Sequence, residues 1–247
     1  MIKHHVIPRF YLDNFTNEEG KLWTFPNDSM GKPKSPKMTS VIKRYNQLYP
    51  ICQAKPFGFE EYYQSIESPA APVVVKTIDQ LQVPTGKDSA WLMAFLANLG
   101  TRTPTARKEI EADIECLLDG FPLKEWMKSK GIIKNLTLYH THEYSMKLFW
   151  KLASRAWQLV KPGDPAHAFV TSMKPVTAVD FNGNPSKSFL TLLNIEMRIV
   201  CPLSNQVGIQ TRRNDEPTIK MLNQVEVTQF NNWTRFGAAE FYSSVKI

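Results

Sequence analysis

The spacing of apolar positions predicts helices through the middle of the chain. From Glu60 to Leu81, apolar residues recur at three- and four-residue intervals, and Pro69 and Pro72 predict a break or kink there. Asp88 and Thr105 have the side chains that favour helix N-caps. Further helices are predicted over residues 89–103, 106–118 and 136–160.

A two-residue period predicts strands on both sides of this helical part. Residues 21–25 alternate between polar and apolar types, whereas the prolines and lysines of residues 26–40 indicate a loop. Beyond the helices, a turn is predicted at residues 182–185 and one last helix at residues 218–236. Strands are predicted over residues 168–171, 175–179, 196–200, 206–210 and 239–242.

This order of elements predicts an α+β fold rather than an alternating βαβ fold. It comprises a small N-terminal β segment, a helical middle of about four to five helices, and a β-rich C-terminal part with one further helix. The 247 residues are interpreted as a single domain. Its three regions are the N-terminal motif and β segment (1–50), the helical region (58–163) and the β-rich region (165–247).

The charge and cysteine content narrow the function classes. The chain has 30 Lys and Arg against 23 Asp and Glu, and this net charge of +7 favours polyanionic partners such as nucleic acid. Cys52, Cys116 and Cys201 are widely spaced, which argues against a zinc knuckle or a disulfide framework. No apolar run has the length of a membrane span and the first residues lack a signal-peptide core, so we expect a cytoplasmic protein without membrane contact.

The N-terminal segment from Lys3 to Phe15 is the densest in side chains that can do chemistry. His4 and His5 are adjacent, and successive residues of an extended chain face opposite sides. The pair is therefore a poor chelator of one metal, but one histidine could act as a general acid or base while the other packs. The alternative is that both histidines are structural.

Polar residues that could bind substrate follow the two histidines. In an extended segment His5, Arg9 and Tyr11 share a face, with a change to a turn or short helix near Asp13. Asn14 adds an amide, and an arginine beside a histidine suits an anionic substrate group. The alternative for Arg9 is an ion pair with a carboxylate at the edge of the core.

Glu67 and Arg102 are the candidates from the predicted helices. Glu67 lies among apolar helix positions, so a buried carboxylate there needs a cationic partner such as His5, Arg9 or Arg102. Arg102 closes its helix, where a cation offsets the helix dipole; an inward-facing substrate contact is the alternative.

The sequence argues against several common kinds of catalytic and metal-binding site. His140 and His142 have the spacing of some metal sites, but on a helix such positions diverge, so we predict no metal ligands there. The chain has no G-x-G-x-x-G, no G-x-x-x-x-G-K and no G-x-S-x-G sequence. These absences argue against kinase, P-loop ATPase, dinucleotide-dependent dehydrogenase and α/β-hydrolase functions.

The opening residues resemble the signature of a microbial family known as domain of unknown function 4238. Its members begin with H-H-x-x-P, an aromatic residue, leucine and phenylalanine, and continue with a glycine and a short strand, as at Gly20 and residues 21–25 here. Further landmarks follow in order: Ser65-Ile66-Glu67, Arg102-Thr103-Pro104, Ala168 to Ser172 with Pro175-Val176, Cys201 to Ser204, and Asn231 with Ala238-Ala239 and Tyr242-Ser243.

The resemblance strengthens some candidates but supplies no activity. His4, His5, Glu67 and Arg102 lie on its landmarks, so we expect them to meet in one pocket. One departure is Met173-Lys174, where the family usually has Asp-Asn. If that aspartate serves catalysis or metal binding in relatives, this chain lacks it.

The leading hypothesis is a phosphate-directed hydrolase, most plausibly a nuclease or phosphodiesterase. His4 or His5 would be the general acid or base, Arg9 and Arg102 would hold the phosphate, and Glu67 would orient a histidine or bind a divalent metal ion, the one cofactor left open. The alternative is a non-enzymatic nucleic-acid-binding or protein-interaction module in which the histidine pair is a structural latch. The oligomeric state stays open.

Overall fold

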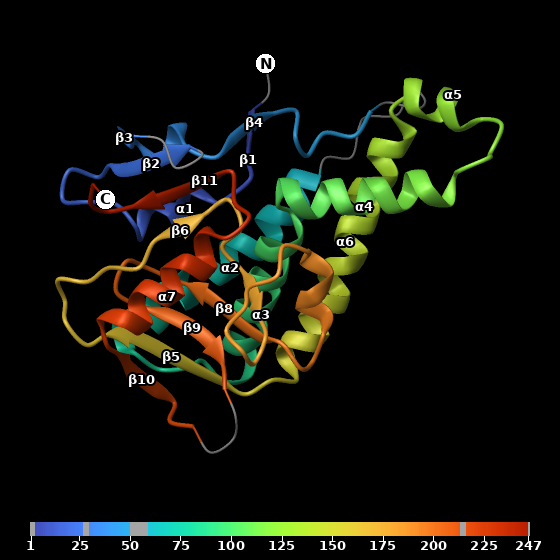
Figure 1. The fold of residues 1–247 in the computed structure, drawn as a ribbon. Coiled ribbons are helices and arrows are strands. Elements are labelled where there is room, and N and C mark those ends of the chain that lie inside the picture. The colour runs from blue at the N-terminus through green and yellow to red at the C-terminus, as the bar shows by residue number, and fades with distance from the viewer. Residues whose placement is uncertain (1–2, 27–29, 50–58, 213–215, 247) are drawn as a thin grey trace.

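The computed structural model describes residues 3–26, 30–49, 59–212 and 216–246. Cys52 lies outside these residues. The fold is α+β, as predicted, with helices gathered in the middle of the sequence and strands at both ends (Figure 1). Whether the chain is a single domain stays a prediction.

The N-terminal part combines short strands with a short helix. Its elements are β1 (Lys3–His5), α1 (Arg9–Asp13), β2 (Leu22–Pro26), β3 (Lys32–Lys34), the 3-10 helix η1 (Pro36–Met38) and β4 (Val41–Lys43). β1 pairs antiparallel with β4, and His4 lies opposite Ile42. The predicted loop 26–40 therefore contains a strand and a 3-10 turn, which its prolines and lysines concealed.

Five helices form the middle of the chain. They are α2 (Phe59–Gln80), α3 (Gly86–Thr101), α4 (Pro104–Leu117), α5 (Lys124–Ser129) and α6 (Ile132–Ala153). α2 continues through Pro69 and Pro72, so the predicted interruption does not end it. The N-cap of α4 is Thr103, whose hydroxyl accepts the Ala106 amide, and not Thr105. α3 begins after Thr85 rather than at Asp88, and α5 was not predicted.

The C-terminal part is built on a five-stranded sheet. Its elements are β5 (Trp157–Pro162), β6 (Thr171–Ser172), β7 (Thr177–Val179), the 3-10 helix η2 (Phe189–Leu193), β8 (Arg198–Pro202), β9 (Gly208–Thr211), β10 (Ile219–Leu222), α7 (Gln224–Arg235) and β11 (Glu240–Ser243). The strand order is β10-β5-β9-β8-β7, with only β10 and β5 parallel.

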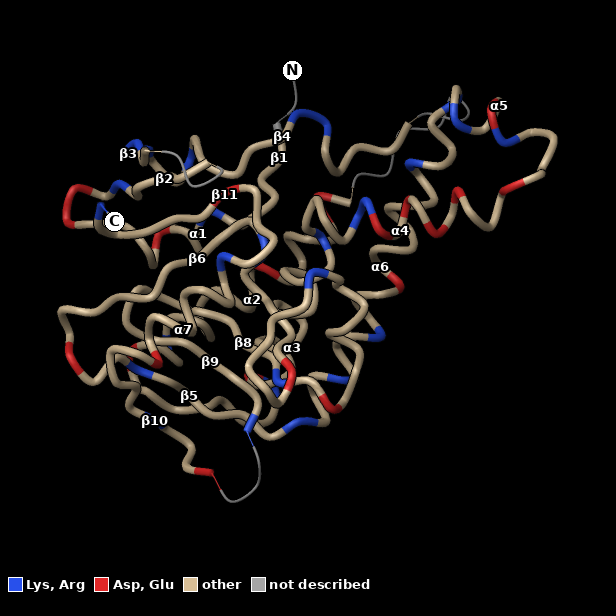
Figure 2. Tube along the Cα trace, in the orientation of Figure 1, with Lys and Arg blue, Asp and Glu red and all other residues tan. Residues whose placement is uncertain are grey.

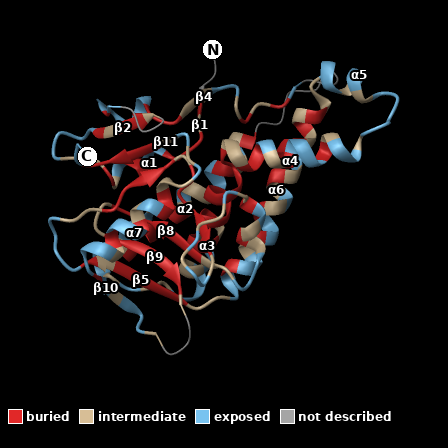
Figure 3. Ribbon diagram, viewed as in Figure 1, coloured by how far each residue is buried: buried red, intermediate tan, exposed pale blue. Residues whose placement is uncertain are grey.

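Both faces of this sheet are covered. Leu159 and Ile199 belong to the main core, which also holds the apolar residues of α3. Their neighbours Val160 and Val200 face the other way, into a second cluster with Phe230 of α7. Figure 3 shows the buried strands between the exposed outer surfaces of the helices.

The prediction of one helix over residues 136–160 is wrong beyond Ala153. The Ser154 amide closes the helix on the Trp150 carbonyl, and residues from Trp157 onward pair with β9 and β10. Because β5 is buried on both faces, apolar and polar residues do not alternate along it as they do in a strand with one exposed face. Its apolar residues therefore extend the helical spacing of the preceding residues by coincidence.

The last predicted helix likewise begins too early. Residues 219–222 form β10, and α7 starts only after Asn223. Asn223 and Glu226 make a reciprocal capping box, which is the sequence signal for this start. The other C-terminal strands were predicted within about two residues, except residues 168–171, of which only Thr171 is in a strand.

The two ends of the chain meet in a second sheet of order β3-β2-β11-β6. β11 pairs antiparallel with β2, so the N-terminal β segment and the C-terminal part share backbone hydrogen bonds. No helix among the described residues combines the length and the apolar character needed to cross a membrane.

Candidate functional site

The first histidine of the opening motif is a buried hydrogen-bond acceptor. His4 is 6% exposed, and its Nδ1 accepts the backbone N–H of Asn46 at 2.8 Å. Asn46 lies three residues beyond β4, so this bond fastens the end of the β1–β4 pair. Since the imidazole accepts through Nδ1, its remaining proton is on Nε2.

The second histidine is half-buried and surrounded by charge. Burial lowers the pKa of His5, and the nearby Arg102 charge lowers it further; the Thr39 backbone, Glu60 and Glu67 act in the opposite direction. The net effect is a lowered pKa, which favours the neutral form of the imidazole. Its Nδ1 is buried and has no hydrogen-bond partner among the described residues.

Arg102, just after α3, links the motif to the helical layer. The guanidinium donates to the Val6 carbonyl and to Glu67, and donates to the His5 carbonyl at 3.3 Å. Its side chain is 3% exposed, against 23% for Glu67. Through the ion pair and the two hydrogen bonds to carbonyls, the guanidinium of Arg102 holds the backbone that follows the histidine pair against α2 and α3.

A second buried arginine lies next to this cluster and was missed in the sequence. Arg107 on α4 donates to the Tyr45 carbonyl and to Asn46 Oδ1, each at 2.5 Å. The Asn46 amide also donates to Glu60 at 2.7 Å. Asn46 thus joins His4, Arg107 and Glu60, a set that no spacing in the sequence brings together.

The structure brings three of the predicted site residues together and separates the rest. His5, Glu67 and Arg102 lie together at the junction of β1, α2 and α3, whereas the His4 side chain contacts Asn46 beside them. Arg9 is outside this cluster: its side chain is 63% exposed and pairs with Asp13 at 3.8 Å. The prediction that Arg9 and Tyr11 share an extended face with His5 is wrong, because residues 9–13 form α1.

Tyr11 and Asn14 connect α1 to the C-terminal part instead. The Tyr11 hydroxyl is fully buried, donates to the Pro202 carbonyl at 2.7 Å and lies 2.9 Å from Thr171 Oγ1. Burial raises the pKa of this phenol well above its ordinary value. The Asn14 amide donates to the Leu203 carbonyl at 3.1 Å. The hydroxyl of Tyr11 is therefore committed to contacts within the core.

The described residues do not assemble a metal site. No group of three or more His, Cys, Asp or Glu side chains in this part of the chain could hold an ion. Glu67 is paired with Arg102, and His140 pairs with Glu143 on the surface of α6 at 3.2 Å. The ring of His142 packs edge-on against Tyr62.

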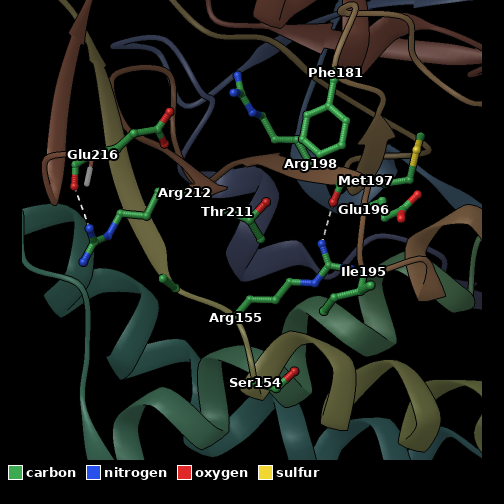
Figure 4. A pocket seen from close by; sticks show the side chains of 11 residues that line it. Ser154, Arg155, Phe181, Ile195, Glu196, Met197, Arg198, Thr211, Arg212 and Glu216 are labelled. Carbon is green, nitrogen blue, oxygen red and sulfur yellow. Dashed lines mark hydrogen bonds between the residues drawn. The ribbon is translucent and has the colours of Figure 1, made fainter. Parts of the chain in front are cut away.

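A cavity of about 400 Å³ at the far end of the five-stranded sheet is lined by three arginines (Figure 4). Arg155 donates to the Met197 carbonyl at 2.5 Å, and Arg212 donates to the Glu216 carbonyl at 2.6 Å. The guanidinium groups of these two and of Arg198 point in different directions in Figure 4. Arg155 and Arg212 hold separate backbone segments, and the three guanidinium groups do not converge on a common ligand position.

The comparisons with known proteins give one finding. A family model described as "Protein of unknown function (DUF4238)" matches residues 3–244. No curated protein and no solved structure matches the chain.

Proposed function

Because the chain belongs to the family described as "Protein of unknown function (DUF4238)", whose description assigns no activity, we propose a function from its own geometry. The protein is a nucleic-acid-binding module whose opening motif is a structural latch. The single observation that carries the proposal is that the latch fastens an unpaired basic segment. This segment, residues 32–44, is called the basic segment below.

The basic segment has an unusual charge. It contains five basic residues and no acidic one, and within the described part of the chain none of the five pairs with a carboxylate. Lys32, Lys37 and Lys43 are exposed. Figure 2 shows blue segments, which mark Lys and Arg, at β3 and next to β4. Phosphate groups are the natural counter-ions of such an uncompensated stretch.

The opening motif holds this segment in a defined conformation. β1 pairs with β4, the Val6 amide donates to the Ser40 carbonyl at 2.8 Å, and the Ile7 amide donates to Ser40 Oγ at 3.0 Å. Ser40 has a φ of 56°, a left-handed conformation that a non-glycine residue adopts only at a cost. The hydrogen bonds to Ser40 offset that cost and fix the turn between β3 and β4.

The strand geometry of β3 gives the charges a regular spacing. Lys32 and Lys34 are two residues apart on an extended strand, so they share a face about 7 Å apart. β3 is also the edge of its sheet, and no other strand of the described residues pairs with its outer side. An ordered, one-sided row of cations lowers the entropy lost when a phosphate backbone binds.

Salt-dependent binding tests this proposal. Fluorescence anisotropy of labelled single- and double-stranded oligonucleotides is measured from 50 to 300 mM salt with the wild type and with the triple variant K32Q/K34Q/K37Q. Each lost phosphate contact reduces the slope of log K against log salt by about 0.7 to 0.9. We expect the triple variant to lose about two units of slope and to bind at least tenfold more weakly at the lowest salt.

A matched variant separates local binding from net charge. K87Q/K130Q/K151Q removes the same charge from three exposed lysines of the helical region. It should retain most of the wild-type affinity and slope. Equal weakening by the two triple variants, or no nucleic-acid binding by the wild type, would contradict the proposal.

The convergence of His5, Glu67 and Arg102 supports a second candidate, a phosphodiesterase. In this candidate the neutral His5 is the general base and Glu67 and Arg102 orient it and the phosphate. The test is cleavage of the same labelled DNA and RNA in the presence of Mg²⁺, Mn²⁺ or chelator. Product formation that H5Q abolishes would favour this candidate, and intact substrate under all three conditions would exclude it.

A further inference from the structure

A small cavity beside the latch is lined by cations and apolar surface. It has a volume of about 200 Å³ and lies between the start of α4, α6 and the residues after β4. Its lining residues are Tyr45, Pro104, Arg107, Lys108, Glu111, Lys134, Thr137 and Leu138. Three of these are basic and one is acidic, so the cavity favours a negatively charged occupant.

Arg107 is the central observation. This residue is 7% exposed, and no carboxylate of the described residues lies within ion-pair distance of its guanidinium. The guanidinium donates hydrogen bonds to neutral groups: the Tyr45 carbonyl, Asn46 Oδ1, and the Tyr63 hydroxyl at 3.4 Å. Its Nε is buried without a partner. A buried charge without a counter-ion is costly, whereas Arg102 nearby has Glu67.

The surroundings add to the attraction for an anion. Arg107 is in the first turn of α4, where the helix dipole is positive. Its guanidinium stacks on the Tyr45 ring with 3.6 Å to the centroid, so the ring and the charge present one continuous surface. Lys134 reaches the same region, because its Nζ donates to the Arg44 carbonyl at 3.4 Å.

The apolar lining defines the rest of the ligand. The Tyr45 ring, Pro104 and Leu138 provide apolar surface, and the volume admits only a small organic body. We infer that this cavity binds a small organic acid whose carboxylate serves as the counter-ion of Arg107 while its apolar body packs against Tyr45, Pro104 and Leu138. This site is independent of the nucleic-acid proposal.

Benzoate and its neutral analogue benzamide are suitable probes. Binding is measured by isothermal titration calorimetry with the whole protein. We expect benzoate to bind at least tenfold more tightly than benzamide, because only the carboxylate compensates the arginine. Absence of benzoate binding up to 10 mM, or equal affinity for the two probes, would overturn the inference.

Variants localise the binding. K134Q removes a cation at the cavity while leaving Arg107 in place, and we expect it to weaken benzoate binding about fivefold or more. K151Q, an equal charge change on an exposed position of the same helix, is expected to leave the affinity unchanged. If R107K folds, its affinity should fall further. Equal affinities for the wild type and K134Q would place the benzoate elsewhere and overturn the assignment.

Discussion

Replacement of Arg102 by methionine is the most informative perturbation of the latch. Methionine retains much of the buried volume of the arginine stem but donates no hydrogen bonds. The variant therefore deprives the Val6 and His5 carbonyls of their donor and leaves Glu67 without its cation. The substitution thus removes the contacts that hold the histidine pair, and it changes no residue within α3 itself.

The expected cost follows from burial. Removing one partner of a buried ion pair costs about 3 to 5 kcal/mol. Glu67 is 23% exposed, so water compensates part of the charge left behind, and the estimate belongs in the lower part of that range. Each unsatisfied buried carbonyl adds about 1 kcal/mol. With the Val6 and His5 carbonyls both left without a donor, we expect R102M to lower the free energy of unfolding by about 5 kcal/mol.

Urea unfolding monitored by tryptophan fluorescence measures this change. The control is R9M, because Arg9 is 63% exposed and its pair with Asp13 spans 3.8 Å. The control should change the free energy of unfolding by less than about 0.5 kcal/mol. An R102M variant within 1 kcal/mol of the wild type would refute the assignment of Arg102 to the latch and favour a role in ligand binding.

Three further predictions concern buried polar groups. Burial lowers the pKa of His5, so as the pH falls through 6.5 the unfolded chain takes up a proton that the folded chain does not. The wild type should therefore lose stability between pH 7 and pH 5 relative to H5Q, as measured by urea titrations at each pH. Burial lowers the pKa of Lys174 from 10.5 to about 8, so between these pH values the folded chain has lost a proton that the unfolded chain still binds. The free energy of unfolding should therefore rise from pH 8 to 10.5 by about 1 to 3 kcal/mol relative to K174M. Parallel pH profiles of the two proteins would contradict this. Y11F leaves a buried carbonyl without its donor and should cost about 1 to 3 kcal/mol by the same assay, whereas Y139F, at an exposed ring, should be neutral.

The sequence predicts the class of the fold because most elements are amphipathic. Helices such as α4 bury one face, which holds Ala106, Ile110 and Ile114, and the spacing of these residues shows it in the sequence. The errors occur where this signal is absent. β5 is buried on both faces and reads as a continuation of α6, and β3 is a three-residue edge strand containing Pro33. Both segments are strands because of the strands with which they pair, and their own sequence patterns do not show it.

The candidate site shows the same division between local pattern and tertiary contacts. The density of polar side chains in the opening motif correctly marks a segment with many contacts, and Glu67 was predicted to need a cation such as Arg102. The sequence could not show that Asn46 links His4 to Arg107, because those contacts span 42 and 61 residues. Nor could it show that α1 turns Arg9 away from the histidines.

Hydrogen exchange in the H4L variant tests the central claim most directly. Leucine has similar bulk to histidine but leaves the Asn46 amide without its acceptor. If the opening motif is a latch for the basic segment, mass spectrometry should show faster exchange across residues 39–46 while the β5–β9 pair stays protected. Wild-type exchange across residues 39–46 in H4L would contradict the claim.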